Sequence, residues 1–126
     1  MVNIKTDLTL EIEEKLKAKA KRESKRYALE VRVTGGICDF VTTKVMPANH
    51  NMPWVTCYEI KTSFNDYQYS ENGANFVGDE NYYVIPDDLI NEIIEKQANG
   101  KFTHVGLISY KNGKFYKKTD GKAFRS

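Results

Sequence analysis

Residues 37–61, ICDFVTTKVMPANHNMPWVTCYEIK, contain two runs rich in β-branched and aromatic residues, which flank a segment with two prolines and two asparagines. Such runs are typical of β-strands, and the segment between them is typical of a loop. We expect strands over 37–45 and 54–61. Asp39 lies inside the first strand, and Glu59 and Lys61 lie at the end of the second.

The sequence around these strands predicts further helices and strands. Apolar residues recur every four positions from Leu8 to Leu16, which predicts an amphipathic helix over 8–26. We expect Asp7 as its N-cap. Charges four residues apart predict supporting ion pairs, Glu11 with Lys15 and Glu13 with Lys17.

The other expected strands cover 28–33, 81–86, 103–110 and 114–118, and a short helix is expected near 64–71. A second amphipathic helix is expected over 87–97, capped by Asp87, with a core face of Leu89, Ile90, Ile93 and Ile94. Asn112-Gly113 is a strong hairpin signal between the last two strands. This order predicts an α/β (α+β) fold, a mixed central sheet flanked by helices.

The size and composition predict one domain of this kind. With 126 residues and 40% hydrophobic residues, we expect a single domain over 1–126, with its core at about 8–118 and a basic tail over 119–126. No run approaches the roughly 18 apolar residues of a membrane span, and the charged N-terminus lacks a signal peptide's apolar stretch. We therefore expect a cytoplasmic protein. Cys38 and Cys57 lie in apolar runs without metal-ligand spacing, which favours buried thiols over a zinc site.

The net charge of +2 is unevenly distributed along the chain. Residues 1–35 carry 9 Lys/Arg and 6 Asp/Glu, residues 36–100 carry 3 and 10, and residues 101–126 carry 7 and 1, which gives +3, −7 and +6. An acidic middle with basic ends fits a cation site beside a phosphate-binding surface. From charge alone, a solubilising surface with a basic tail is the favoured alternative.

Strand alternation brings three of these charges together. Glu59 and Lys61 share one face, about 7 Å apart along their strand, and a neighbouring strand would bring Asp39 alongside. Burying such charges is costly unless they are paired. A Mg²⁺ ion held by the two carboxylates would offset this cost, and Lys61 would then activate water. A structural ion pair is the alternative, since the D/E-x-K tripeptide occurs four times in the chain.

The chain resembles the PD-(D/E)xK nuclease superfamily, in particular small MmcB-like and phage-encoded members. The resemblance covers about residues 28–110 and rests on EVRVTGGICDFVTTK, WVTCYEIKTSFNDY, NFVGDENYYVIPDDL and VGLISY. The family pattern has a Glu before the first strand, an Asp in the second and E-[IV]-K in the third. The resemblance implies a restriction-endonuclease-like core. The chain lacks the lysine that many relatives have shortly after the position of Asp66.

The resemblance also implies roles for individual residues. Asp39 and Glu59 would bind the metal together with the main-chain carbonyl of Ile60, and Lys61 would be the catalytic lysine. Glu30 would be the additional catalytic acid. Relatives often carry that acid on the first helix, so Glu11, Glu13 and Glu14 stay open as alternatives.

The sequence thus predicts a deoxyribonuclease dependent on Mg²⁺ or Mn²⁺, of DNA-repair, recombination or phage type, in the cytoplasm of a bacterium or a phage-infected cell. Its partner would be DNA, with a homodimer or a recruiting protein also conceivable. DNA contacts are expected at the C-terminal basic residues Lys111, Lys114, Lys117, Lys118, Lys122 and Arg125. The alternative is an inactive nuclease-fold protein, either a DNA-binding accessory factor or a protein inhibitor.

Overall fold

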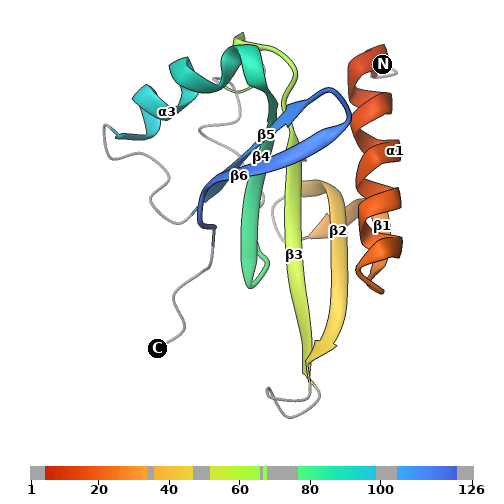
Figure 1. Cartoon of the computed structure of the whole chain (residues 1–126). Helices are drawn as coiled ribbons and strands as arrows, with labels where there is room; N and C mark the ends of the chain where they lie inside the picture. Colours follow the sequence, from red (N-terminus) through yellow and green to blue (C-terminus); the bar gives the residue numbers. More distant parts are fainter. Residues whose placement is uncertain are drawn as a thin grey trace.

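The computed structural model describes residues 5–33, 36–46, 52–65, 67, 77–98 and 105–121. Within these ranges a six-stranded mixed sheet is accompanied by a long helix, α1, and a shorter helix, α3 (Figure 1). The elements in chain order are α1 Asp7–Arg22, β1 Arg26–Val33, β2 Gly36–Met46, β3 Met52–Ile60, β4 Glu80–Pro86, the 3-10 turn η2 Asp87–Leu89, α3 Ile90–Ala98, β5 Gly106–Lys111 and β6 Lys114–Thr119. This architecture confirms the expected α+β fold class.

The strands lie in the sheet in chain order, from β1 to β6. β3, β4 and β5 run parallel to one another, whereas β2 and β6 run antiparallel to their neighbours. The carboxyl ends of β3, β4 and β5 therefore meet at one edge of the sheet, and the amino-terminal part of β2 lies at the same edge. Asp39 and Glu59 are near this edge, and Asp87 follows β4 directly.

Helix α1 begins and ends differently from the sequence-based expectation. Its N-cap is Thr6, whose Oγ1 accepts a hydrogen bond from Thr9 N at 3.1 Å, so the assignment of Asp7 was wrong. The helix ends at Arg22, because Ser24 takes a left-handed φ of 57° and turns the chain into β1. The expected ion pairs are also wrong: Tyr110 donates to Glu11, Lys5 pairs with Glu13, and Glu14 pairs with Lys17. Glu13 is buried, which keeps it from an exposed helical pair.

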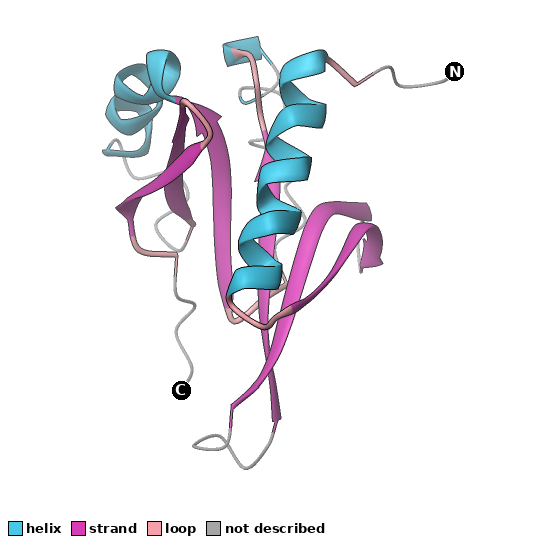
Figure 2. Cartoon of the chain, turned by 45° about the vertical axis from the view of Figure 1, so that its right-hand side comes forward, coloured by secondary structure: helices cyan, strands magenta, loops and turns pink. Residues whose placement is uncertain are grey.

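Two apolar clusters pack against the sheet. The first contains Ile12 and Leu16 of α1 with Tyr58, Ile60, Tyr82, Val84, Ile108 and Tyr110. The second contains Ile90 and Ile93 of the η2–α3 segment with Tyr67, Tyr83, Ile85 and Leu107. Because neighbouring residues of β4 belong to different clusters, the clusters lie on opposite faces of the sheet. Figure 2 shows α1 lying across one face.

The chain after β4 follows the expected order with altered bounds. Asp87 lies inside η2, and its carboxylate accepts a hydrogen bond from Ser109 Oγ at 2.7 Å, so it does not cap α3. The predicted core face is confirmed, since Ile90 and Ile93 are buried and Leu89 and Ile94 pack against them. Of the helix expected near 64–71, residues 64, 65 and 67 are helical and the others lie outside the described residues.

The Asn112-Gly113 hairpin is confirmed between β5 and β6. Both residues have positive φ, 51° and 80°, as a two-residue turn of this kind requires. The packed chain continues beyond β6, because Asn81 N donates to Gly121 O at 2.9 Å and Gly121 is buried. The segment expected to be a tail is therefore packed as far as Gly121, and residues 122–126 lie outside the described residues.

Two further expectations concern the cysteines and the membrane. Cys38 and Cys57 are free thiols with no exposed surface, which confirms their expected burial. Among the described residues, the helices are too short or too polar to cross a bilayer.

Candidate functional site

The candidate site lies where β2 and β3 stop pairing through their main chains. Their ladder runs from Met46 and Met52 to Phe40 and Tyr58, and one further step would set Asp39 beside Glu59. At that position Asp39 Oδ2 accepts a hydrogen bond from Ile60 N at 2.8 Å. A carboxylate thus takes the place of a main-chain acceptor at the end of the ladder.

Asp39 and Glu59 form a close carboxyl pair in a buried setting. Glu59 is only 6% exposed and Asp39 is half-buried, and the Asp39 carboxylate is close enough to shift the pKa of Glu59. Burial, and after it the nearby Asp39 carboxylate, raise the pKa of Glu59 to about 8. Both effects penalise the charged form of Glu59.

Lys61 follows β3 directly and partly compensates this penalty. Its Nζ lies 4.0 Å from Glu59 Oε2, and its positive charge lowers the pKa of Glu59. Lys61 N donates to Val84 O at 3.0 Å, which fixes the main chain between β3 and β4. The structure therefore brings Asp39, Glu59 and Lys61 together, as their positions on neighbouring strands predicted.

One oxygen of the pair, Glu59 Oε1, is buried without a hydrogen-bond partner in the described part of the chain. An unsatisfied buried carboxyl oxygen costs free energy, and two adjacent carboxyl groups repel each other when both are ionised. A divalent cation with oxygen ligands would relieve both costs. Asp39 and Glu59 thus fit a hard cation by the chemistry of their donor atoms.

The candidates for an additional acid lie elsewhere. Lys5 Nζ bridges Glu30 Oε1 at 2.9 Å and Glu13 Oε2 at 2.8 Å. Glu11 accepts from Tyr110, and Glu14 is an exposed partner of Lys17. Within the described ranges, His, Cys, Asp and Glu side chains form no group of three that is arranged to hold a metal ion. The pair of Asp39 and Glu59 therefore stands without Glu30 or an α1 carboxylate beside it.

No model of a known protein family matches the chain, and neither does any curated protein or solved structure. The assignment of the candidate site therefore depends on the geometry of Asp39, Glu59 and Lys61.

Of the six residues expected to contact DNA, the structure describes four. Lys111, Lys114, Lys117 and Lys118 are exposed on the β5–β6 hairpin. Lys111 lies 3.9 Å from an Asp87 carboxylate oxygen and Lys117 lies 4.0 Å from one of Glu80, so both are partly neutralised. Lys122 and Arg125 lie outside the described residues.

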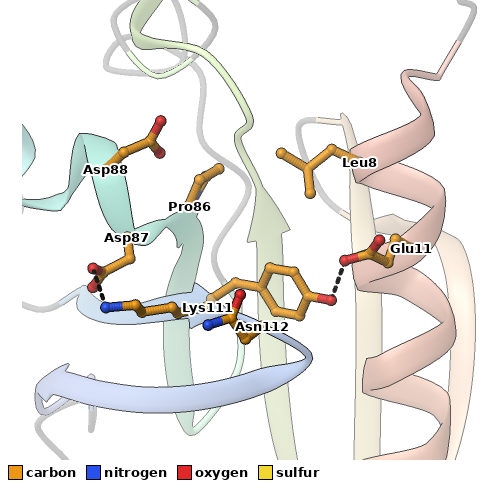
Figure 3. A pocket seen from close by; sticks show the side chains of 8 residues that line it. Leu8, Glu11, Pro86, Asp87, Asp88, Lys111 and Asn112 are labelled. Atoms are coloured by element: carbon orange, nitrogen blue, oxygen red, sulfur yellow. Dashed lines mark hydrogen bonds and ion pairs between the residues drawn. The ribbon is translucent and has the colours of Figure 1, made fainter.

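A second concave feature was not predicted from the sequence. A hollow of about 410 Å³ lies between the start of α1, the end of β4 and the β5–β6 turn. Its residues come from segments around 8–11, 86–88 and 110–112, which are far apart in the chain. Asp87, one of the residues that line it (Figure 3), is predicted from the sequence only as a helix cap.

Proposed function

We propose that this chain is a metal-dependent DNA nuclease that hydrolyses phosphodiester bonds, with Asp39, Glu59 and Lys61 as its active residues. The observation that carries the proposal is the burial of Glu59 against Asp39, with Oε1 unpartnered and Lys61 Nζ 4.0 Å away. Burying Glu59 near a second carboxyl group costs free energy, so the arrangement favours a binding role.

Each residue of the site would have its own role in hydrolysis. Asp39 and Glu59 would hold Mg²⁺ or Mn²⁺, with the main-chain carbonyl of Ile60 as a further ligand. When bound, the ion supplies Lewis-acid polarisation of a phosphoryl oxygen. Lys61 would orient the attacking water and assist removal of its proton. The hydrogen bond from Ile60 N would hold Asp39 Oδ2 in place for its role.

The DNA backbone would be bound by the basic hairpin of β5 and β6. Lys114 and Lys118 are exposed there, and their ammonium groups are suited to phosphate contacts. Lys122 and Arg125 would extend this surface. The resemblance to PD-(D/E)xK nucleases supports a role in DNA repair, recombination or phage biology, in the cytoplasm of a bacterium or a phage-infected cell.

One observation favours a second candidate, an inactive nuclease-fold protein that binds DNA or inhibits another protein. Glu30 is bound by Lys5, and no third acid of the described chain joins Asp39 and Glu59 in a metal-binding group. A nuclease of this family usually employs such an acid. The retained lysine beside the carboxyl pair argues for catalysis over this alternative.

A single-turnover cleavage assay tests the proposal. Labelled single-stranded, duplex and branched DNA is incubated with excess protein and Mn²⁺, and Asp39→Asn is compared with the unchanged chain. We expect cleavage by the unchanged chain and none by Asp39→Asn. Lys25→Ala is the matched control, because Glu23 and Lys25 form the same tripeptide outside the site and should be dispensable. Binding without cleavage of any substrate would support the accessory-factor alternative.

A further inference from the structure

Arg32 lies near the carboxyl pair, at the end of β1 that leads into β2. In the β1–β2 ladder it is paired with Ile37, which precedes Asp39 by two residues. Partners on antiparallel strands lie about 5 Å apart and two residues along a strand span about 7 Å, so about 9 Å separates the main chains of Arg32 and Asp39. Among the basic residues of the described strands, Arg32 is the fewest register steps from Asp39. A phosphate beside the one that is cleaved would therefore lie within its range.

The guanidinium of Arg32 is exposed and has no ionic partner in the described part of the chain. Lys5, which reaches the same strand, is by contrast bound by two glutamates. The Asp39 carboxylate accepts from Ile60 N and forms no ion pair with Arg32 among these residues. A free guanidinium keeps its five N–H donors, and its planar fork matches the oxygens of a phosphate. Arg32 thus keeps its donors available to an external anion.

The acidic residue of β1 is held away from the strand ladder. Glu30 stands opposite Asp39 in the register, but this step is missing from the main-chain pairing, and Glu30 has a left-handed φ of 52°. Its carboxylate lies 2.9 Å from Lys5 Nζ, which neutralises it. Residues 31–38 contain no acid. The end of β1 and the start of β2 therefore present Arg32 to an anion without a competing carboxylate of their own.

The surroundings of Arg32 suit a sugar–phosphate chain. Its strand partner Ile37 is 50% exposed, so an apolar side chain and a cation lie on neighbouring strands. A DNA backbone offers sugars next to phosphates, and contacts to both position a protein on DNA. In the strand order the carboxyl pair on β2 and β3 also lies between Arg32 on β1 and the basic β5–β6 hairpin. A strand held at both places would pass the site.

From this placement we propose that Arg32 binds a backbone phosphate next to the cleaved one and so positions the DNA strand in the site. The proposal rests on the proposed nuclease function. Two parallel N–H···O bonds from one guanidinium fix the orientation of a phosphate as well as its position. Holding the reacting group in a defined geometry lowers the barrier to its reaction. Arg32 is then a substrate-binding residue on the side of the site away from the hairpin.

DNA binding by Arg32→Gln tests the proposal, with Arg22→Gln as the matched control. Arg22 is also exposed and without an ionic partner in the described chain, but it ends α1. Fluorescence anisotropy with labelled single-stranded and duplex DNA, in EDTA so that nothing is cut, gives the affinity over a salt series. Arg32→Gln should bind about tenfold more weakly, as expected for a lost charge-assisted bond. Its slope against the logarithm of salt should fall by about 0.9. Arg22→Gln should match the unchanged chain.

Two further measurements separate the contact from folding and from catalysis. Arg32→Lys should recover the salt slope, because the charge returns, and all three variants should melt with the unchanged chain, since exposed side chains without partners contribute little stability. Equal affinities of Arg32→Gln and Arg22→Gln would overturn the proposal, as would a loss of binding that follows a lower melting temperature. A selective loss in Arg32→Gln, with no cleavage of any DNA by the unchanged chain and Mn²⁺, would support the phosphate contact and count only against the nuclease function.

Discussion

Ile60 N donates a hydrogen bond to Asp39 Oδ2 at 2.8 Å, so an aspartate side chain continues the pairing of β2 and β3 beyond the last main-chain pair. This contact ties the position of Asp39 to the strand that carries Glu59. Asp39 is therefore both a structural acceptor and a candidate ligand. Substitutions at the site must be interpreted with both roles in view.

Replacing Lys61 with alanine separates catalysis from charge compensation. If Lys61 serves the attacking water, cleavage should fall by about 10²-fold or more, while the melting temperature with Mn²⁺ stays close to that of the unchanged chain. If Lys61 only neutralises the carboxyl pair, the metal-free protein should lose about 3 kcal/mol of unfolding free energy. Thermal melts with and without Mn²⁺, alongside single-turnover cleavage, decide between these outcomes. A large loss of stability with Mn²⁺ present, in a chain that cuts no DNA, would establish the structural pair.

The raised pKa of Glu59 predicts how metal-free stability depends on pH. The pKa is about 8 in the folded chain against an ordinary value of 4.5, so between these values the folded state holds more protons than the unfolded state. The stability from this proton is complete below the ordinary value and is lost as the pH rises through the folded pKa. Urea unfolding should therefore show lower stability at about pH 9 than at about pH 5 from this group.

Glu59→Gln should remove that part of the pH dependence, whereas Glu92→Gln on the exposed face of α3 should keep it. Added Mn²⁺ should oppose the loss at high pH, because a carboxylate ligand must be deprotonated to bind metal. An unchanged pH slope in Glu59→Gln would show that Glu59 titrates near its ordinary value.

DNA binding should depend steeply on salt if the β5–β6 hairpin contacts phosphates. Each phosphate contact contributes a slope of about 0.9 in the logarithm of affinity against the logarithm of salt concentration. The double variant Lys114→Ala, Lys118→Ala should lower the slope by about 1.8 if both residues contact phosphate. Fluorescence anisotropy over a salt series measures it, with Lys25→Ala as the control because Lys25 pairs with Glu23. Binding that does not respond to salt contradicts an electrostatic interface.

The C-terminal segment should divide sharply into a packed part and a dispensable part. Deleting 122–126 should leave the unfolding free energy nearly unchanged. Deleting 119–126 should lower it, because Thr119 Oγ1 accepts from Leu107 N at 2.8 Å and Gly121 O accepts from Asn81 N at 2.9 Å. Urea unfolding of the two truncations gives the comparison. Equal stabilities would mean that these two contacts contribute nothing measurable.

Gly121 also shows what sequence patterns do not contain. A Cβ at this position would lie 2.1 Å from Asn81 O, so the glycine permits a close approach between segments forty residues apart. Hydrophobic periodicity gave the strands and helices because it reflects local geometry. The approach of Gly121 depends on the whole sheet, so the composition of 119–126 suggested only a basic tail.

The candidate site also has a part that local sequence patterns predict and a part that depends on contacts between distant segments. Asp39, Glu59 and Lys61 could be grouped from the sequence because two adjacent strands have a period of two residues. Lys5, Glu13 and Glu30 could not be grouped, since Lys5 joins the helix to a β1 residue with a left-handed φ of 52°. The hollow was also missed, because its walls come from three separate segments.

The complete burial of both native thiols has a practical consequence for labelling. Contact with Cys38 lowers the pKa of Cys57 to about 7, but a maleimide reagent cannot reach either sulfur while the chain is folded. A single cysteine introduced at exposed Glu92, on α3, should therefore accept a fluorophore selectively, with Cys38 and Cys57 left in place. Distances from that dye to labelled DNA could then be followed in an otherwise unaltered protein.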